Sequence, residues 1–183
     1  MLFISSGHAS RSIKHNDPGA VNKAGIKEGD LVIEFRDLVC HELDILGMKY
    51  IKDSDEESLA QYLKRIQTGS GSVCLEYHMD AAASETATGT TVIIGNDADR
   101  LDKAFAKEIA DNTSAILGIK NRGVITEAES HRGRLGLMRE QGIVALCELC
   151  FISNPDDLDR YHLRKRELAQ SHALILRKYE QLL

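Results

Sequence analysis

The stretch Gly142-Ile-Val-Ala-Leu-Cys-Glu148-Leu-Cys-Phe-Ile152 is the most apolar and most β-prone part of this sequence. Because both of its alternating faces are hydrophobic, it is predicted to be a central strand that is covered on both sides. Glu148 is the one charged residue within it. A buried carboxylate is costly unless it is paired, bound to a metal or functional. Glu148 is therefore either a structural residue, satisfied by an arginine or by backbone amides, or part of a functional site.

The segments before and after this strand alternate between short β-prone runs and amphipathic helical patterns. Further strands are predicted at residues 2–5, 48–52, 72–77 and 89–94, with a short one at 124–125. Helices are predicted at residues 29–46, 54–67 and 99–117, and from 154 to the C-terminus with a candidate break near His162. Ser54-x-x-Glu57 is predicted to be the capping box that opens the second helix. This alternation predicts an α/β fold in which residues 1–183 form a single layered domain, with a mostly parallel central sheet flanked by helices.

The composition is ordinary for a globular protein: 183 residues, a formal net charge of -5, 43% hydrophobic and 28% charged residues. The acidic balance does not favour nucleic-acid binding, and no stretch approaches the roughly 18 apolar residues of a membrane span. The first residues lack the basic and apolar regions of a signal peptide, so we expect synthesis in the cytoplasm. We also expect a monomer, because the sequence shows no apolar helical face beyond those that the core needs.

The four cysteines lie in apolar segments and are expected to be buried free thiols: Cys40, Cys74, Cys147 and Cys150.

Two histidines are predicted to lie at strand ends, His8 after the first strand and His78 at the end of the third. Ligands of open α/β sheets gather at the carboxyl ends of the strands, so both imidazoles and Glu148 are expected at one edge. A catalytic zinc typically takes three protein ligands and leaves one position for water. Glu28, just before the first helix, is the favoured anionic ligand and Glu34 is the alternative, although spacing alone singles out neither.

In this hypothesis Glu148 is the general base that accepts a proton and returns it to a leaving amine. The competing interpretation is structural, because a histidine at a strand end is more often a hydrogen-bonded structural residue than a ligand. The remaining histidines lie in polar or helical surroundings and are expected to be solvated: His15, His41, His131, His162 and His172.

Several short motifs, in order along nearly the whole chain, resemble those of the zinc-dependent N-acetylmuramoyl-L-alanine amidases of type 3, the family that includes autolysins and phage endolysins. In that family the matching segments read Pro-Gly-His, Asp-Pro-Gly-Ala, Gly-x-x-Glu, Ser-x-His-x-Asn-Ala, Ser-Gly, Arg-Gly-Val and Leu-x-Glu-x-Gly-Phe-x-Ser-Asn. The segments here are Ser6-Gly7-His8, Asp17-Pro18-Gly19-Ala20-Val21, Gly25-Ile26-Lys27-Glu28, Glu76-Tyr77-His78-Met79-Asp80-Ala81, Thr88-Gly89-Thr90, Asn121-Arg122-Gly123-Val124 and Leu146-Cys147-Glu148-Leu149-Cys150-Phe151-Ile152-Ser153-Asn154.

The resemblance implies a zinc ion held by His8, Glu28 and His78, with Glu148 as the catalytic acid and base. It implies that the substrate is peptidoglycan, cleaved at the amide between the lactyl group of N-acetylmuramic acid and the first L-alanine of the stem peptide. It does not assign substrate-binding residues. It also implies action on the cell wall after release from the cytoplasm, as a phage lysin or a mother-cell lytic enzyme of sporulation.

Three residues near the expected site depart from the family pattern. Asp80 stands where an asparagine is usual, Glu76 replaces a small or neutral residue, and Cys150 replaces a glycine. On a strand, Glu76 points to the same side as His78, so it is either a partner that orients this ring or an exposed charge. Cys150 is expected to share a face with Glu148.

Three other functions are compatible with parts of the sequence. A zinc carboxypeptidase-like peptidase uses the same ligand types, but its first pair is His-x-x-Glu, whereas His8 and Glu28 are twenty residues apart. A non-catalytic peptidoglycan-binding module would be expected to lack a ligand or the base, and all four residues are present. A nucleotide-binding loop at Gly69-Ser-Gly-Ser72 is disfavoured because these glycines precede a strand.

Overall fold

The computed structural model describes residues 1–183 and contains one six-stranded sheet with the strand order β2-β1-β3-β6-β4-β5. β6 lies inside the sheet between β3 and β4, and every one of its residues is buried, as predicted for a strand covered on both sides. All neighbouring strands are parallel except β4 and β6, which confirms the mostly parallel sheet. The strands are β1 (Leu2–Ser5), β2 (Tyr50–Lys52), β3 (Val73–Asp80), β4 (Thr90–Ile94), β5 (Asn121–Thr126) and β6 (Ile143–Phe151).

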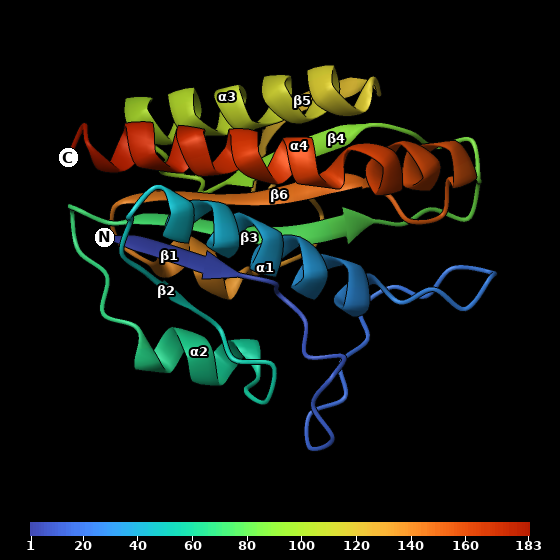
Figure 1. Ribbon diagram of the computed structural model, residues 1–183, viewed down its shortest axis with the longest axis horizontal. Coiled ribbons are helices and arrows are strands. Elements are labelled where there is room, and N and C mark those ends of the chain that lie inside the picture. Colours follow the sequence, from blue (N-terminus) through green and yellow to red (C-terminus); the bar gives the residue numbers. More distant parts are fainter.

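Three long helices cover one face of this sheet and a short helix covers part of the other. α1 (Glu28–Ile45), α3 (Arg100–Leu117) and α4 (Pro155–Glu180) pack on the larger apolar cluster. α2 (Leu59–Arg65) and the 3-10 turn η1 (Gly136–Arg139) border a smaller cluster on the opposite face. Figure 1 shows α2 on the opposite side of the sheet from α3 and α4. No helix combines the length and apolar character that a membrane crossing requires.

The alternation of side chains along β6 separates the two faces. Cys147 and Leu149 belong to the larger cluster, whereas Val144 and Leu146 belong to the smaller one. Glu148 continues the row of Val144 and Leu146, because successive residues of a strand point to opposite faces. The smaller cluster contains no apolar residue of β6 beyond Leu146, so the carboxyl end of this face is left for polar side chains.

The longer helices begin at polar capping residues or end at glycines. α1 is followed by Gly47 in the left-handed region, with φ of 67°, and α3 by Gly118, also with φ of 67°. Asp99 and Asn154 accept hydrogen bonds from backbone N–H groups of the first turns of α3 and α4. Such side chains satisfy backbone donors that have no partner within the helix.

Several predicted boundaries were wrong. Ser54 and Glu57 form a turn, and the capping box of α2 is made instead by Ser58 and Gln61. The intervening acids are held outside the helix, because Asp55 binds Arg36 and Glu57 binds Arg65. Two elements are also longer than predicted: β5 spans six residues, and β3 continues past His78 to Asp80. α4 runs through His162 without the candidate break.

His172 is another correction, because it is fully buried rather than solvated. Its Nδ1 lies 3.3 Å from the Tyr77 hydroxyl and its Nε2 lies 3.0 Å from the Thr113 hydroxyl. Burial lowers the pKa of His172 to about 3, so the ring is neutral and acts as a polar member of the core. The sequence pattern did not separate a buried histidine from an exposed one on a long, charged helix.

A bulge near the end of β6 places Cys150 on a different face of the sheet from the one predicted. His78 pairs with Glu148, but Asp80 pairs with Phe151, so β6 carries one extra residue there. Such a bulge interrupts the strict alternation of faces. Cys150 consequently packs in the larger apolar cluster together with Leu149. The expectation that it shares a face with Glu148 was therefore wrong. All four cysteines are buried and free, as predicted.

Candidate active site

Three segments that are distant in the sequence bring His8, Glu28 and His78 together at the carboxyl end of the sheet. His8 follows β1, Glu28 is the first residue of α1, and His78 lies on β3. Glu28 Oε1 lies 3.0 Å from His78 Nδ1 and 3.1 Å from His8 Nε2. One nitrogen or oxygen atom from each residue lies within 4.8 Å of the others, an arrangement that could hold a metal ion.

The carboxylate of Glu28 is fixed by backbone donors as well as by the imidazoles. The N–H of Met79 donates to Oε1 at 3.0 Å and the N–H of Ala20 donates to Oε2 at 2.8 Å. Burial alone would raise the pKa of Glu28, but the hydrogen bonds to His78 and His8 outweigh it and hold the pKa well below its usual range. Glu28 is thus an ionised, immobile acceptor.

Each histidine also has a carboxylate on its outer nitrogen. Asp17 Oδ2 lies 3.0 Å from His8 Nδ1, and Glu76 Oε1 lies 3.2 Å from His78 Nε2. Histidines that bind metals usually have such a partner on the second nitrogen, which fixes the tautomer and the ring orientation. Burial opposes protonation of His78, but its hydrogen bonds to Glu28 and Glu76 outweigh it and raise the pKa to about 10.

Two glycines leave room for this ligand set. A Cβ atom on Gly7 would lie 2.1 Å from His78 Nε2, and one on Gly19 would lie 2.6 Å from Glu28 Oε2. Both glycines also have φ in the left-handed region, at 67° and 64°, where other residues are strained. The loops that carry these glycines can therefore pass directly over the imidazoles and the carboxylate, which fits a metal-binding cradle.

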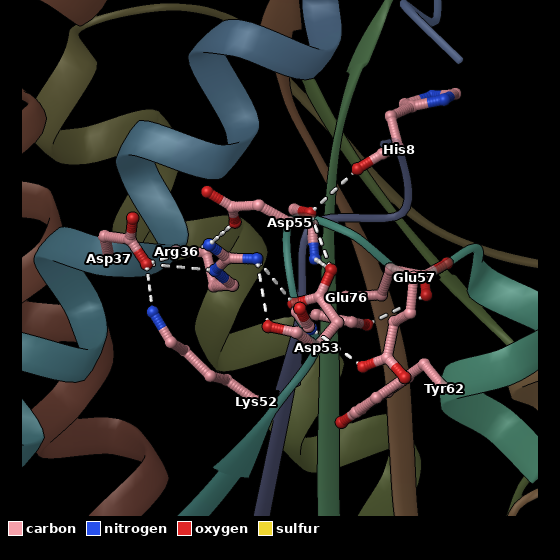
Figure 2. Close-up of polar contacts among 12 residues, drawn as sticks. His8, Arg36, Asp37, Lys52, Asp53, Asp55, Glu57, Tyr62 and Glu76 are labelled. Atoms are coloured by element: carbon pink, nitrogen blue, oxygen red, sulfur yellow. Dashed lines mark hydrogen bonds and ion pairs between the residues drawn. The ribbon is translucent and has the colours of Figure 1, made fainter. Parts of the chain in front are cut away.

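A buried ion-pair network anchors the turn that leads to His8. The backbone N–H and the hydroxyl of Ser6 both donate to Asp53 Oδ2, at 3.1 and 2.7 Å, and Arg36 Nη1 donates to Asp53 Oδ1 at 2.8 Å. Figure 2 shows the fully buried Arg36 among Asp37, Asp53 and Asp55. Sequence reasoning missed Arg36, because a lone arginine in an amphipathic helix usually indicates a solvated position.

Glu148 lies next to His78 in the sheet register and is only 1% exposed. Arg132 Nη2 is 2.8 Å from Glu148 Oε1, but the geometry is not that of a hydrogen bond, and neither carboxylate oxygen has a donor. Burial raises the pKa of Glu148 to about 7, against the opposing charges of His78 and Arg132. A buried carboxylate that titrates near neutrality and lacks donors is suited to accept and release a proton.

This pKa predicts a pH dependence for the stability of the metal-free protein. Because folding raises the pKa of Glu148 from 4.5 to about 7, its effect on stability is neutral below pH 4.5, becomes steadily less favourable as pH rises from 4.5 to 7, and levels off above pH 7. Between pH 5 and 8, we expect the wild type to lose up to about 3 kcal/mol more unfolding free energy than Glu148→Gln. Urea denaturation of both proteins measures the difference, and parallel pH profiles would contradict it.

The structure thus brings together the three residues for which metal binding is predicted, and it places Glu148 beside His78 on the same face. Glu34, the alternative ligand, points elsewhere and accepts a hydrogen bond at 2.6 Å from Lys165 on α4. Glu76 is buried and holds the His78 ring, so it is not the exposed charge that the sequence left open.

An α/β sheet that carries a His–Glu–His cluster able to hold a metal ion, with a buried carboxylate at the same edge, is an arrangement suited to metal-dependent hydrolysis. The sequence profile of one family, described as N-acetylmuramoyl-L-alanine amidase, matches residues 2–177. The chain belongs to this family.

Known relatives agree with this assignment. The amidase AmiC of Neisseria meningitidis serogroup B is 24% identical over 128 residues, which are 67% of this chain and 30% of that protein. The chain therefore spans less than a third of that relative. An N-acetylmuramoyl-L-alanine amidase from Clostridium difficile 630 superposes with a TM-score of 0.81 at 19% identity, covering 98% of this chain and 96% of that one. The CwlD amidase of Clostridioides difficile, solved in complex with the GerS lipoprotein, gives 0.81 at 18% identity, covering 100% and 98%. At these identities the two structures show a common fold.

Proposed function

We propose that this chain hydrolyses the amide between N-acetylmuramic acid and the first L-alanine of the stem peptide, and so acts on the peptidoglycan of the cell wall. The observation that carries the proposal is the convergence of His8, Glu28 and His78 beside Glu148. Membership of the amidase family supports the same substrate.

We also propose that the metal is zinc, held by His8, Glu28 and His78. Two imidazoles and one carboxylate are the ligand types of many catalytic zinc sites. A bound zinc ion would supply a Lewis acid that polarises the amide carbonyl and makes water more acidic. The protein's own contribution is to hold the ligands rigidly: Glu28 through two backbone N–H groups, and each ring through an outer carboxylate.

Glu148 is proposed to move the proton. Its carboxylate oxygens have no hydrogen-bond donors, so they are available to accept a proton from the attacking water. The same carboxyl group then donates this proton to the amide nitrogen of L-alanine, which leaves as an amine. A pKa of about 7 suits both steps, because general catalysis is most effective when the pKa lies near the working pH.

Mass spectrometry of purified peptidoglycan digested by the protein tests the function. The expected products are intact stem peptides with a free L-alanine amino group and glycan strands without peptides. Cleavage between amino acids would indicate a peptidase instead, and binding without any product would indicate a non-catalytic module. Chelation of the metal should stop product formation and zinc should restore it.

Glu76 gives a further prediction that does not depend on the substrate. Its Oε2 accepts a hydrogen bond at 2.9 Å from the Ser5 hydroxyl while Oε1 faces His78, so the carboxylate is held in place on both sides. Loss of such an outer partner typically weakens metal binding about 10–100-fold. We expect this loss for Glu76→Ala and a smaller loss for Ser5→Ala, measured by competition with a chromophoric chelator. Zinc affinity of Glu76→Ala within about twofold of wild type would show that Glu76 does not support the site.

A further inference from the structure

A polar cavity of about 440 Å³ opens beside Glu148, between the amino ends of β4 and β5 and the loop that follows β5. Three cationic side chains line it, those of Lys120, Arg122 and Arg132. The wall also contains three carboxylates, those of Asp80, Glu129 and Glu148, so the cavity is not uniformly basic. Its binding preference depends on which of these charges are already paired.

Two of the three acidic residues of the wall, Glu129 and Asp80, are held by hydrogen bonds within the protein, and Glu148 has only its ion pair with Arg132. Glu129 Oε2 accepts hydrogen bonds at 2.7 Å from both the N–H and the hydroxyl of Thr126. Asp80 Oδ1 accepts from the N–H of Ala81 at 2.9 Å and from Arg132 Nη2 at 3.3 Å. These two carboxylates therefore have little capacity left to attract a cationic ligand.

The cationic residues keep most of their donors free. Lys120 makes no side-chain hydrogen bond or ion pair. Arg122 donates one hydrogen bond, to the carbonyl of Thr88 at 3.5 Å, and its guanidinium carbon lies 5.2 Å from the centre of the Phe151 ring. The guanidinium of Arg132 uses only Nη2, toward Asp80 and Glu148, so that Nε and Nη1 have no acceptor. Unused donors on three cations make this cavity a receptor for an anionic group with several acceptor oxygens.

The residues on both sides of Arg132 have an unusual backbone conformation. His131 and Gly133, on either side of it, both have φ in the left-handed region, at 57° and 75°. A residue other than glycine in this region is uncommon, and such strain is found at functional sites. Arg134, two residues further on, does not line the cavity.

The substrate of the proposed function carries its negative charge on one side of the scissile amide. The glycan side presents neutral hydroxyl and acetamido groups, because the lactyl carboxyl is itself part of the amide. The peptide side carries free carboxylates. We infer that Arg132, together with Lys120 and Arg122, binds a carboxylate of the stem peptide, so that the cavity beside Glu148 receives the peptide side. This inference rests on the proposed function.

Arg132 is able to exchange its present partners for the substrate. Its contact with Glu148 lacks hydrogen-bond geometry, and its hydrogen bond to Asp80 is long at 3.3 Å. A ligand carboxylate, in contrast, can accept two parallel N–H bonds from one guanidinium. Binding of that carboxylate would draw Arg132 away from Glu148 and leave the latter free for proton transfer.

Two muropeptides that differ only in charge test this inference. In one, the carboxylate of the second stem residue is free, and in the other it is converted to the amide. We expect wild-type kcat/KM to favour the free carboxylate by about 10–100-fold, the range that hydrogen bonds to a charged group supply. Arg132→Ala should remove most of this preference, chiefly by raising KM for the charged substrate. Arg132→Lys should keep part of it, since lysine retains the charge without the planar fork.

Arg134→Ala, on the same loop, is the matched control and should keep the wild-type preference. An equal loss on both substrates in Arg132→Ala would overturn the inference, because Arg132 would then act through Glu148 alone. An unchanged preference would overturn it as well.

Calorimetry separates this inference from the proposed function. The probe is the free peptide L-alanyl-D-isoglutamate, titrated into the zinc-loaded wild type and into Arg132→Ala. Weaker binding by the variant supports the carboxylate site even if neither muropeptide is cleaved, in which case only the proposed function fails. Cleavage at the expected amide with equal peptide binding by both proteins would leave the function standing and overturn the carboxylate site.

Discussion

Glu148→Gln is expected to lower turnover of peptidoglycan by about 10²–10⁴-fold, the usual contribution of general acid–base catalysis, while zinc stays bound. Glutamine keeps the size of the side chain, but it cannot accept and return the proton. The three proposed metal ligands do not hydrogen-bond to Glu148, so their arrangement should persist. Hydrolysis rates and metal content are measured on the same preparation, which separates loss of chemistry from loss of metal.

Glu56→Gln is a suitable control, because it removes one negative charge from an exposed residue outside the site. Its turnover should equal that of the wild type. Wild-type turnover in Glu148→Gln would show that another group moves the proton. A variant without zinc would show instead that Glu148 acts on the stability of the metal site.

His78→Ala is expected to abolish zinc binding and, with it, activity. The substitution removes one of the three proposed ligands and leaves the buried carboxylates of Glu28 and Glu76 without the imidazole between them. Two carboxylates facing an empty volume repel each other and are poorly solvated. We therefore expect an affinity loss beyond the 10–100-fold typical of losing an outer partner, measured by equilibrium dialysis with metal analysis.

His41→Ala provides the comparison, since His41 is an exposed histidine on α1 and should have no effect on zinc. His8→Ala should resemble His78→Ala in zinc content. Full zinc occupancy in either site variant would remove the histidines from the ligand set. Because His78→Ala also affects buried charges, its folding should be verified by circular dichroism before the dialysis result is interpreted.

The amino-acid sequence alone was sufficient for the fold class and for most of the candidate site. β6 is so uniformly apolar that a central strand was the expected structure. Glu148 therefore stood out as the one charged residue within it. His8 and His78 were predicted to lie at one edge because parallel strands bring their carboxyl ends together. Hydrophobic periodicity is a local property, so a single sequence predicts the elements well, although the capping box of α2 was predicted four residues too early.

The tertiary structure decided what depends on contacts between distant segments. Glu28 and Glu34 were both possible ligands by position, and only the packing of α1 places one against the imidazoles and the other against Lys165. The burial of Arg36 and His172 and the contact between Arg132 and Glu148 could not be predicted from the sequence either. The physical reason is common to all: a polar or charged side chain is tolerated in the interior when a partner from elsewhere in the chain meets it, and local sequence does not encode that meeting.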